Sequence, residues 1–146
     1  MDVDRDAPVI VEKSVDFDAP PEAVWEVLVD VDAWPEWNPD VKSAALDGEF
    51  AEGSRFKWKS GPSTITSTIE RADRPAIAGW TGTTLGARAT HVWELEPTDR
   101  GTRVTTRESM SGVVPRLFSG SMRRKLETSL DTWLEEMSGA VARRGR

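Results

Sequence analysis

The stretch Trp34–Val41, WPEWNPDV, places two tryptophans around a proline. Pro35 and Pro39 restrict the backbone, so this stretch is predicted to form no more than a short helical turn. Trp34 and Trp37 are three residues apart and point in the same direction only if that turn is helical. Two interpretations follow: the rings stack on a ligand, or they close one end of a hydrophobic core. We expect at least one ring to seal the core, with ligand contact secondary.

The segment before this turn, DAPPEAVWEVLVD from Asp18 to Asp30, is typical of a helix. Pro20 and Pro21 suit a first helical turn, in which a backbone N–H is not needed. An apolar stripe at helical spacing is formed by Val24, Val27, Leu28 and Val31. Upstream, a period of two predicts a strand, with Val9, Val11, Val15 and Phe17 on one face. Lys13 falls on the same face and is expected to extend into solvent at an edge or to contact an acidic ligand.

Residues 41 to 110 show short alternating segments separated by turn residues, which predicts antiparallel strands. RFKWK (55–59) and TITSTIE (64–70) form one expected hairpin across the four-residue loop SGPS, with Trp58 opposite Ile65 and Phe56 opposite Ser67. IAGWTGT (77–83) predicts the next strand. ARATHVWELEP (87–97) and TRVTTRESM (102–110) predict a second hairpin.

The remainder of the chain, from about Pro115 to Arg143, predicts one long helix. Its apolar stripe consists of Met122, Leu126, Leu130, Trp133, Met137 and Val141, with Ser129 as a small member. Gly120 weakens the beginning of this helix by about 1 kcal/mol relative to alanine, so a break or a mobile first turn is expected there.

The element order is therefore strand, helix, short helical turn, about six strands and a long helix. This predicts a single α+β domain over residues 1–146, with its core at about 9–142. A curved antiparallel sheet of six to seven strands needs one face covered, and the long helix can cover it. A hollow between the two would accommodate an apolar ligand.

Composition excludes several classes of function. The chain has no cysteine, which rules out disulfides and thiolate metal sites, and its single histidine, His91, rules out a histidine-rich zinc site. A net charge of −6 argues against nucleic-acid binding. No apolar run is long enough to span a bilayer, and the acidic start is unlike a signal peptide, so the expected location is the cytoplasm. No metal or cofactor is predicted.

Three features resemble one known superfamily. They are APPEAVWEVLVDVDAWPEWNPDV (Ala19–Val41), HVWELEPTDRGTRVT (His91–Thr105) and the long C-terminal helix. Together they are similar to the START-like superfamily with the Bet v 1 helix-grip fold, and to its bacterial polyketide cyclase/dehydrase and lipid-transport branch, the SRPBCC proteins. The resemblance implies a curved sheet gripping the long helix, with two short helices after the first strand.

The resemblance specifies activity less closely, because the superfamily includes cyclases, lipid carriers, hydrolases and co-chaperones. Its cyclases commonly use arginine and tyrosine in the cavity, but this chain has no tyrosine. Its iron–sulfur oxygenases need a His-His-Asp iron site, which one histidine cannot supply. No oligomeric state is predicted.

His91 and Glu108 are the candidate catalytic residues. Pairing Leu95 with Val104 in the second hairpin places His91 opposite Glu108 and Ala89 opposite Met110, whereas a two-residue slip would place His91 opposite Thr106. The pair has three interpretations. It is a general base suited to enolising a ketone, a polar anchor for a ligand, or a buried hydrogen-bonded pair without a further role.

The inward positions of the strands and of the long helix also predict the wall of the ligand cavity. The expected lining residues are Phe56, Trp58, Ser67, Trp80, Trp93, Thr106, Met110, Met122, Leu126, Ser129, Leu130 and Trp133. Large rings at such positions are usually core residues, but a core residue can also form a cavity wall.

Two hypotheses of function remain. In the first, the protein binds a polyketide-like or lipid-like small molecule in its cavity and either carries it or promotes its cyclisation or dehydration. In the second, it is a co-chaperone-like adaptor that contacts other proteins without turnover. A dry, filled interior would contradict the first hypothesis.

Overall fold

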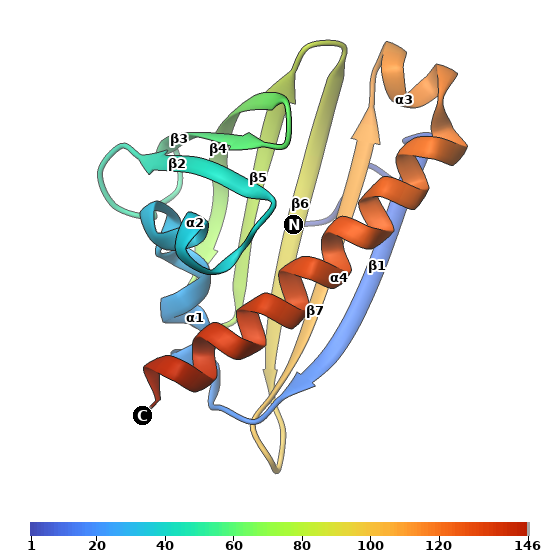
Figure 1. Cartoon of the computed structure of the whole chain (residues 1–146). Coiled ribbons are helices and arrows are strands. Elements are labelled where there is room, and N and C mark those ends of the chain that lie inside the picture. Colours follow the sequence, from blue (N-terminus) through green and yellow to red (C-terminus); the bar gives the residue numbers. More distant parts are fainter. Residues whose placement is uncertain (146) are drawn as a thin grey trace.

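The computed structural model describes residues 1–145, and its elements follow the order expected from the sequence (Figure 1). The strands are β1 (Val9–Phe17), β2 (Val41–Leu46), β3 (Arg55–Ser60), β4 (Ser63–Asp73), β5 (Ile77–Thr84), β6 (Ala87–Pro97) and β7 (Thr102–Ser111). The helices are α1 (Pro21–Val29), the 3-10 turn η1 (Val31–Ala33), α2 (Trp34–Trp37), α3 (Val113–Leu117) and α4 (Ser119–Arg144). Arg146, the last residue of the expected domain, lies outside the described residues.

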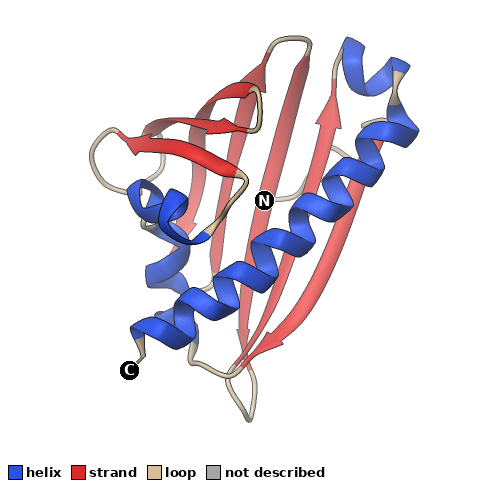
Figure 2. Ribbon diagram, in the orientation of Figure 1, coloured by secondary structure: helices blue, strands red, loops and turns tan. Residues whose placement is uncertain are grey.

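Within residues 1–145 the strands form one seven-stranded antiparallel sheet in the order β1-β7-β6-β5-β4-β3-β2. Irregular pairing between Val41 and Ser43 and between Ile69 and Arg71 marks bulges, which bend a sheet. Helix α4 runs diagonally across one face of the curved sheet, and α1 and α2 lie near its C-terminal half (Figure 2). The predicted helix-grip fold is confirmed.

The predicted strand registers are confirmed in both hairpins. The expected pairs are all present: Trp58 with Ile65, Phe56 with Ser67, Leu95 with Val104, Ala89 with Met110 and His91 with Glu108. The connection between β3 and β4 differs from the expected four-residue loop, because Ser60 and Ser63 themselves pair and leave only Gly61 and Pro62 in the turn.

The C-terminal helix is broken, as expected, but earlier than Gly120. Phe118, with φ −124° and ψ 40°, separates the short α3 from α4. Helix α3 leaves the axis of α4 because it packs against the β5–β6 turn, where the Val114 N–H donates to the Gly86 carbonyl at 3.1 Å. The expected single helix over 115–143 is therefore two helices.

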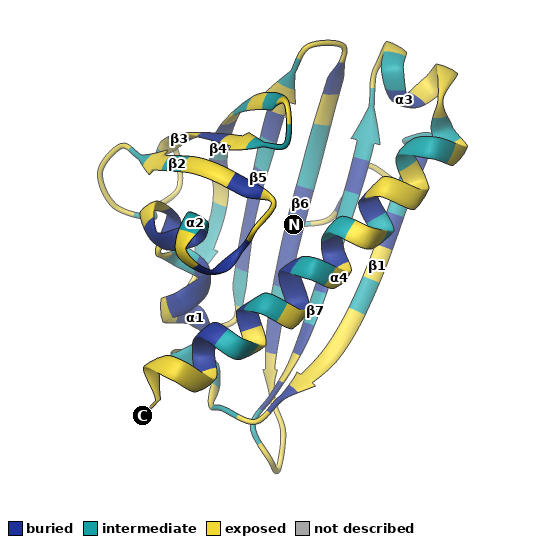
Figure 3. Ribbon diagram, viewed as in Figure 1, coloured by how far each residue is buried: buried dark blue, intermediate teal, exposed yellow. Residues whose placement is uncertain are grey.

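The core lies between α4 and the sheet and continues under α1 and α2, where the buried residues gather (Figure 3). Trp34 is fully buried, and its ring centre lies 4.9 Å from that of Trp133 and 5.4 Å from that of Phe56. Its indole N–H donates to the Leu28 carbonyl at 3.0 Å. Because α2 is helical, Trp37 also reaches Trp133, at 5.6 Å. Both rings of the WPEW turn thus seal the core.

One residue of the apolar face of β1 stays outside the core. Val15 is 44% exposed, whereas Val9, Val11 and Phe17 on the same strand are buried. Lys13 on the same strand instead pairs with Asp131 of α4 at 3.2 Å, which fastens the helix to this edge.

Candidate functional site

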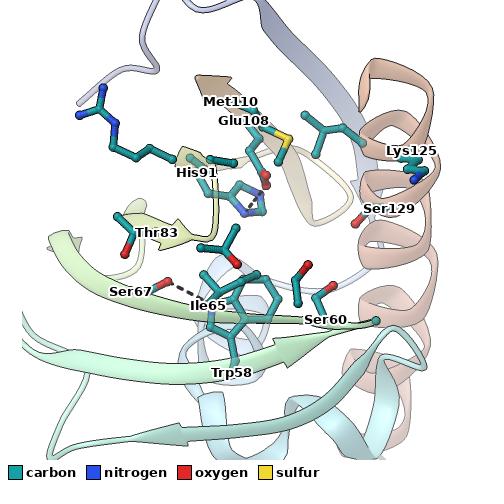
Figure 4. Close-up of a pocket in the computed structure, with 18 of the residues that line it drawn as sticks. Trp58, Ser60, Ile65, Ser67, Thr83, His91, Glu108, Met110, Lys125 and Ser129 are labelled. Carbon is teal, nitrogen blue, oxygen red and sulfur yellow. Dashed lines mark hydrogen bonds and ion pairs between the residues drawn. The ribbon is translucent and has the colours of Figure 1, made fainter. Parts of the chain in front are cut away.

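A cavity of about 540 Å³ lies between the sheet and the N-terminal half of α4 (Figure 4). Residues from β3 to β7, from the turns β3–β4 and β5–β6, from α3 and from α4 contribute to its wall. Three indole rings line it, those of Trp58, Trp80 and Trp133. The interior is therefore hollow where the sequence predicted a ligand space.

Ten of the fourteen predicted site residues line this cavity. They are Trp58, Ser67, Trp80, His91, Glu108, Met110, Met122, Leu126, Ser129 and Trp133. They come from six elements that are far apart in the sequence, and the inward alternation of each strand brings them to one space.

Four predicted residues do not line the cavity: Phe56, Trp93, Thr106 and Leu130. All four are buried. The ring of Phe56 packs edge-on against Trp34, and that of Trp93 packs against His91 and Trp133. Their positions face inward as predicted, but they belong to filled core.

His91 on β6 and Glu108 on β7 form the most polar contact of the wall. The His91 Nδ1 lies 2.9 Å from a Glu108 carboxylate oxygen, Oε1, and the His91 Nε2 lies 2.8 Å from the Thr106 hydroxyl. The strand register is the one predicted, and the imidazole also reaches the residue that the alternative register would have placed opposite it. Both ring nitrogens therefore have partners on β7.

The two side chains differ in access to the cavity. The His91 side chain is 3% exposed and that of Glu108 is 14% exposed. A neutral imidazole that donates from Nδ1 to Glu108 accepts at Nε2 from Thr106, so its hydrogen bonds are complete. A carboxylate accepts several hydrogen bonds, and Glu108 is left with capacity toward the cavity. Both residues line the cavity, but Glu108 is the more exposed of the two and keeps hydrogen-bonding capacity, while the His91 imidazole holds its carboxylate by a hydrogen bond.

Further polar groups line the cavity from β4 and α4. The Trp58 indole N–H donates to the Ser67 Oγ at 3.1 Å, so the Ser67 hydroxyl hydrogen remains free to donate elsewhere. Ser129 faces the same space from α4, and Lys125 lies one turn closer to the start of that helix (Figure 4). The cavity combines a mostly apolar wall with a few separate hydrogen-bonding points.

The outer side of β7 supports this arrangement electrostatically. Arg107, which alternates with Glu108 and Thr106, pairs with Glu94 on β6 and with Glu12 on β1. Burial alone would lower the pKa of Arg107, but its hydrogen bonds to Glu94 and Glu12 and their negative charges raise that pKa above its ordinary value. These ion pairs join β1, β7 and β6 directly behind the His91–Glu108 pair.

Sequence reasoning missed part of the wall. Ile65 and Ala89 share strand faces with Trp58, Ser67 and His91, so their alternation could have identified them. Gly82 also lines the cavity, and its lack of a side chain leaves room where Ile65 and Ser67 approach. Other lining residues had no local signal, because folding alone brings these turns and element ends to the cavity: Asp40, Ser60, Gly61, Pro62, Ser63, Leu85 and Val114.

Within the described residues, no group of three or more histidine, aspartate or glutamate side chains is arranged to hold a metal ion. No helix in residues 1–145 combines the length and the apolar character needed to cross a bilayer.

Comparisons with known proteins agree with this geometry. The family described as polyketide cyclase/dehydrase and lipid transport matches residues 8–141. No curated protein sequence matches the chain significantly.

Solved structures share the fold at low sequence identity. An aromatase/cyclase, Zhui from Streptomyces sp. R1128, superposes with a TM-score of 0.82 at 18% identity, over 94% of this chain and 95% of that one. A START superfamily protein from Mycobacterium smegmatis gives 0.79 at 14% identity, over 92% and 97%. Ara h 8.0201 gives 0.69 at 15% identity, over 91% and 97%. At these identities the likeness concerns the fold.

Proposed function

This chain belongs to the polyketide cyclase/dehydrase and lipid-transport family, and on that premise we propose that it binds a hydrophobic small molecule, polyketide-like or lipid-like, in the cavity between the sheet and α4. The observation that carries this proposal is the cavity itself. Its volume of about 540 Å³ falls within the range of about 300–1,000 Å³ that is typical of small-molecule sites. A filled core would have favoured the adaptor hypothesis instead.

The wall also supports a class of ligand. Indole rings and the side chains of Met110, Met122 and Leu126 suit an apolar body, and methionines adapt to ligands of different shape. Glu108 can accept a hydrogen bond, and the Ser67 hydroxyl can donate one. The proposed ligand therefore has a mainly apolar skeleton with a hydroxyl or other donor at the end that reaches β7, and an acceptor near β4.

A second candidate function, cyclisation or dehydration of the bound molecule, is supported by the His91–Glu108 pair. A carboxylate at the surface of a largely apolar cavity is suited to remove a proton beside a ketone, and a rigid wall restricts a flexible chain to few conformations. In this proposal Glu108 is the base and His91 is a positioning residue. The sequence assigned the base to His91, whose two nitrogens are both occupied in the structure.

Native mass spectrometry of the protein purified from its own host tests the binding proposal. We expect a small apolar molecule to co-purify with the folded chain in a one-to-one complex. Incubation of the isolated complex then separates carriage from catalysis, because a carrier returns the molecule with unchanged mass and connectivity. Protein that is always empty and also binds no member of a panel of fatty acids and aromatic polyketides would contradict the proposal. The cytoplasmic location expected from the sequence stays a prediction.

A further inference from the structure

Most of the exposed large hydrophobic side chains of the described residues gather at one end of the molecule. Leu85 is 97% exposed in the β5–β6 turn, and Val113, Leu117 and Phe118 are 66%, 69% and 59% exposed on α3 and just after it. We call these four residues the apolar tip. Its two parts are neighbours, because the Val114 N–H bonds to the Gly86 carbonyl. The remaining exposed large hydrophobic residue, Val15, lies on β1.

The apolar tip adjoins the cavity through Leu85 and through Val114, the neighbour of Val113 on α3. Leu85 and Val114 line the cavity directly, as does Met122 in the first turn of α4. Figure 3 shows exposed positions along α3 beside the β5–β6 turn. An exposed apolar surface of this kind marks a place where another apolar surface is contacted.

The same segment is strongly basic in an otherwise acidic chain. Residues 109–126 contain Arg116, Arg123, Arg124 and Lys125 and no acidic residue, whereas the whole chain has a net charge of −6. Arg116, Arg124 and Lys125 are exposed, and none of them forms an ion pair with another residue of the described range 1–145. Arg123 donates to the Ile10 carbonyl at 2.9 Å and is thereby held toward β1. The apolar tip thus has a basic border.

We propose that the apolar tip docks on an anionic lipid bilayer, with Leu85, Leu117 and Phe118 entering the headgroup region and Arg116 and Arg124 contacting lipid phosphates. A segment that combines large apolar residues with basic residues is typical of the membrane interface. Basic residues near an anionic leaflet add electrostatic attraction that salt weakens. The charges of the border therefore complement an anionic surface.

A second copy of the chain is a poorer occupant of this surface. A twofold contact places the same patch of each copy against the other, so Arg116 and Arg124 of one copy would approach those of its partner. Like charges brought together in this way oppose association. The tip is also built from a turn and a five-residue helix that project from the molecule, which suits insertion into a soft surface.

This orientation would place the cavity mouth against the lipid. An apolar ligand could then pass between bilayer and cavity with little exposure to water. This consequence rests on the proposed ligand binding, whereas docking itself requires only the apolar tip and its basic border.

Flotation of the full chain with lipid vesicles tests the proposal. We expect binding to vesicles of phosphatidylcholine mixed with phosphatidylglycerol, weaker binding to phosphatidylcholine alone, and loss of binding as salt is raised. The double variant Leu117→Ser/Phe118→Ser should reduce vesicle affinity by about tenfold or more, because both side chains lose their apolar transfer. The matched control is Val15→Ser, which removes an exposed apolar side chain from β1 and should bind like the wild type.

A charge-reversal pair tests the border. Arg116→Glu/Arg124→Glu should abolish the preference for anionic vesicles. The control Lys57→Glu/Lys59→Glu makes the same change of charge on the exposed face of β3 and should retain more of this preference. Circular dichroism confirms that every variant is folded. Three results would overturn the proposal. One is that the wild type binds neither kind of vesicle, and another is that the Val15→Ser control loses as much vesicle affinity as Leu117→Ser/Phe118→Ser. The third is that sedimentation shows Leu117→Ser/Phe118→Ser to dissociate a dimer.

Ligand binding is measured separately in vesicle-free buffer with a fluorescent fatty acid. Leu117→Ser/Phe118→Ser should bind this probe like the wild type, since neither residue lines the cavity. Vesicle binding without probe binding would leave docking intact and count against the proposed function. Probe binding without vesicle binding would support the proposed function and count against docking on the bilayer.

Discussion

The imidazole of His91 and the carboxylate of Glu108 lie 2.9 Å apart across neighbouring strands, one almost completely buried and the other at the surface of the cavity. His91 is further held through its second nitrogen by Thr106, and its ring packs 5.1 Å from the rings of Trp80 and Trp93. The histidine is thus fixed on every side. Of the two groups, Glu108 keeps hydrogen-bonding capacity toward the cavity.

We expect Glu108→Gln to weaken ligand binding by about tenfold to a hundredfold, because hydrogen bonds to a charged group contribute about 1.5–3 kcal/mol. Isothermal titration with the co-purified ligand measures the effect. Glu96→Gln is the matched control, since Glu96 is an exposed residue of β6 without an ion pair among the described residues. Equal affinities of wild type and Glu108→Gln would remove the carboxylate from the site.

We expect His91→Ala to weaken ligand binding as well, while the chain stays folded. If His91 acts by positioning the carboxylate, the double variant His91→Ala/Glu108→Gln should bind no more weakly than Glu108→Gln alone. Titration of the four proteins of this double-mutant cycle measures the coupling. Strictly additive losses would show that His91 contacts the ligand independently of Glu108.

Ser129→Phe should block the cavity, because Ser129 faces it from α4 and a phenyl ring would occupy part of its volume. We expect ligand binding to be lost while the thermal unfolding temperature stays close to that of the wild type or rises, since a ring that fills an apolar void gains contacts. Ser138→Phe, on the exposed side of the same helix, should leave binding unchanged. Retained binding in Ser129→Phe would place the ligand elsewhere.

Trp34→Phe should lower the free energy of unfolding by about 1–3 kcal/mol, because the Leu28 carbonyl loses its buried hydrogen-bond donor. Urea denaturation measures this change. Trp25→Phe is a control in which no indole hydrogen bond to another described residue is lost. A smaller effect at Trp34 than at Trp25 would contradict the assigned role of the WPEW turn.

Two glycines near the broken helix should respond to alanine in opposite directions. Gly112 has φ +114° and ψ −174°, and a side chain there would meet the Gly86 carbonyl oxygen at 2.7 Å, so Gly112→Ala should destabilise by about 1–3 kcal/mol. Gly120 lies in the first turn of α4, where an added Cβ would meet only the Arg124 guanidinium at an ordinary contact distance of 3.7 Å, so Gly120→Ala should stabilise by up to about 1 kcal/mol. Thermal denaturation compares the stabilities of the two variants. If both were destabilised, the first turn of α4 would have no room for the alanine side chain at position 120.

Much of this architecture was predictable from local patterns. Alternation around Trp58 and Leu95 predicts the inward faces of both hairpins, because a one-residue slip would turn every apolar side chain of a strand outward. It does not exclude a two-residue slip, which would place His91 opposite Thr106, and the structure shows His91 opposite Glu108. The break in the C-terminal helix was expected from Gly120 but occurs at Phe118. Its position depends on the contact of α3 with the β5–β6 turn, which the local sequence does not describe.

Membership of the cavity wall was less predictable. Phe56 and Trp58 lie on the same face of β3, yet only Trp58 reaches the cavity. Trp34 packs edge-on against both rings, at 5.4 Å from Phe56 and 5.6 Å from Trp58, so the strand pattern alone does not tell which of the two borders empty space. Leu85 had no recognisable role until folding placed its turn beside α3.

The sequence by itself determined the order of the elements, the inward face of each strand and the sealing role of WPEWNPDV, because periodicity and proline restrict the backbone locally. Only the tertiary structure decided which inward side chains border empty space, which nitrogen of His91 meets which partner, and where the exposed hydrophobic residues gather. These properties depend on distances between elements that are remote in the chain. Periodicity specifies the direction of a side chain, whereas a cavity exists only where the opposite wall is too far away to fill it.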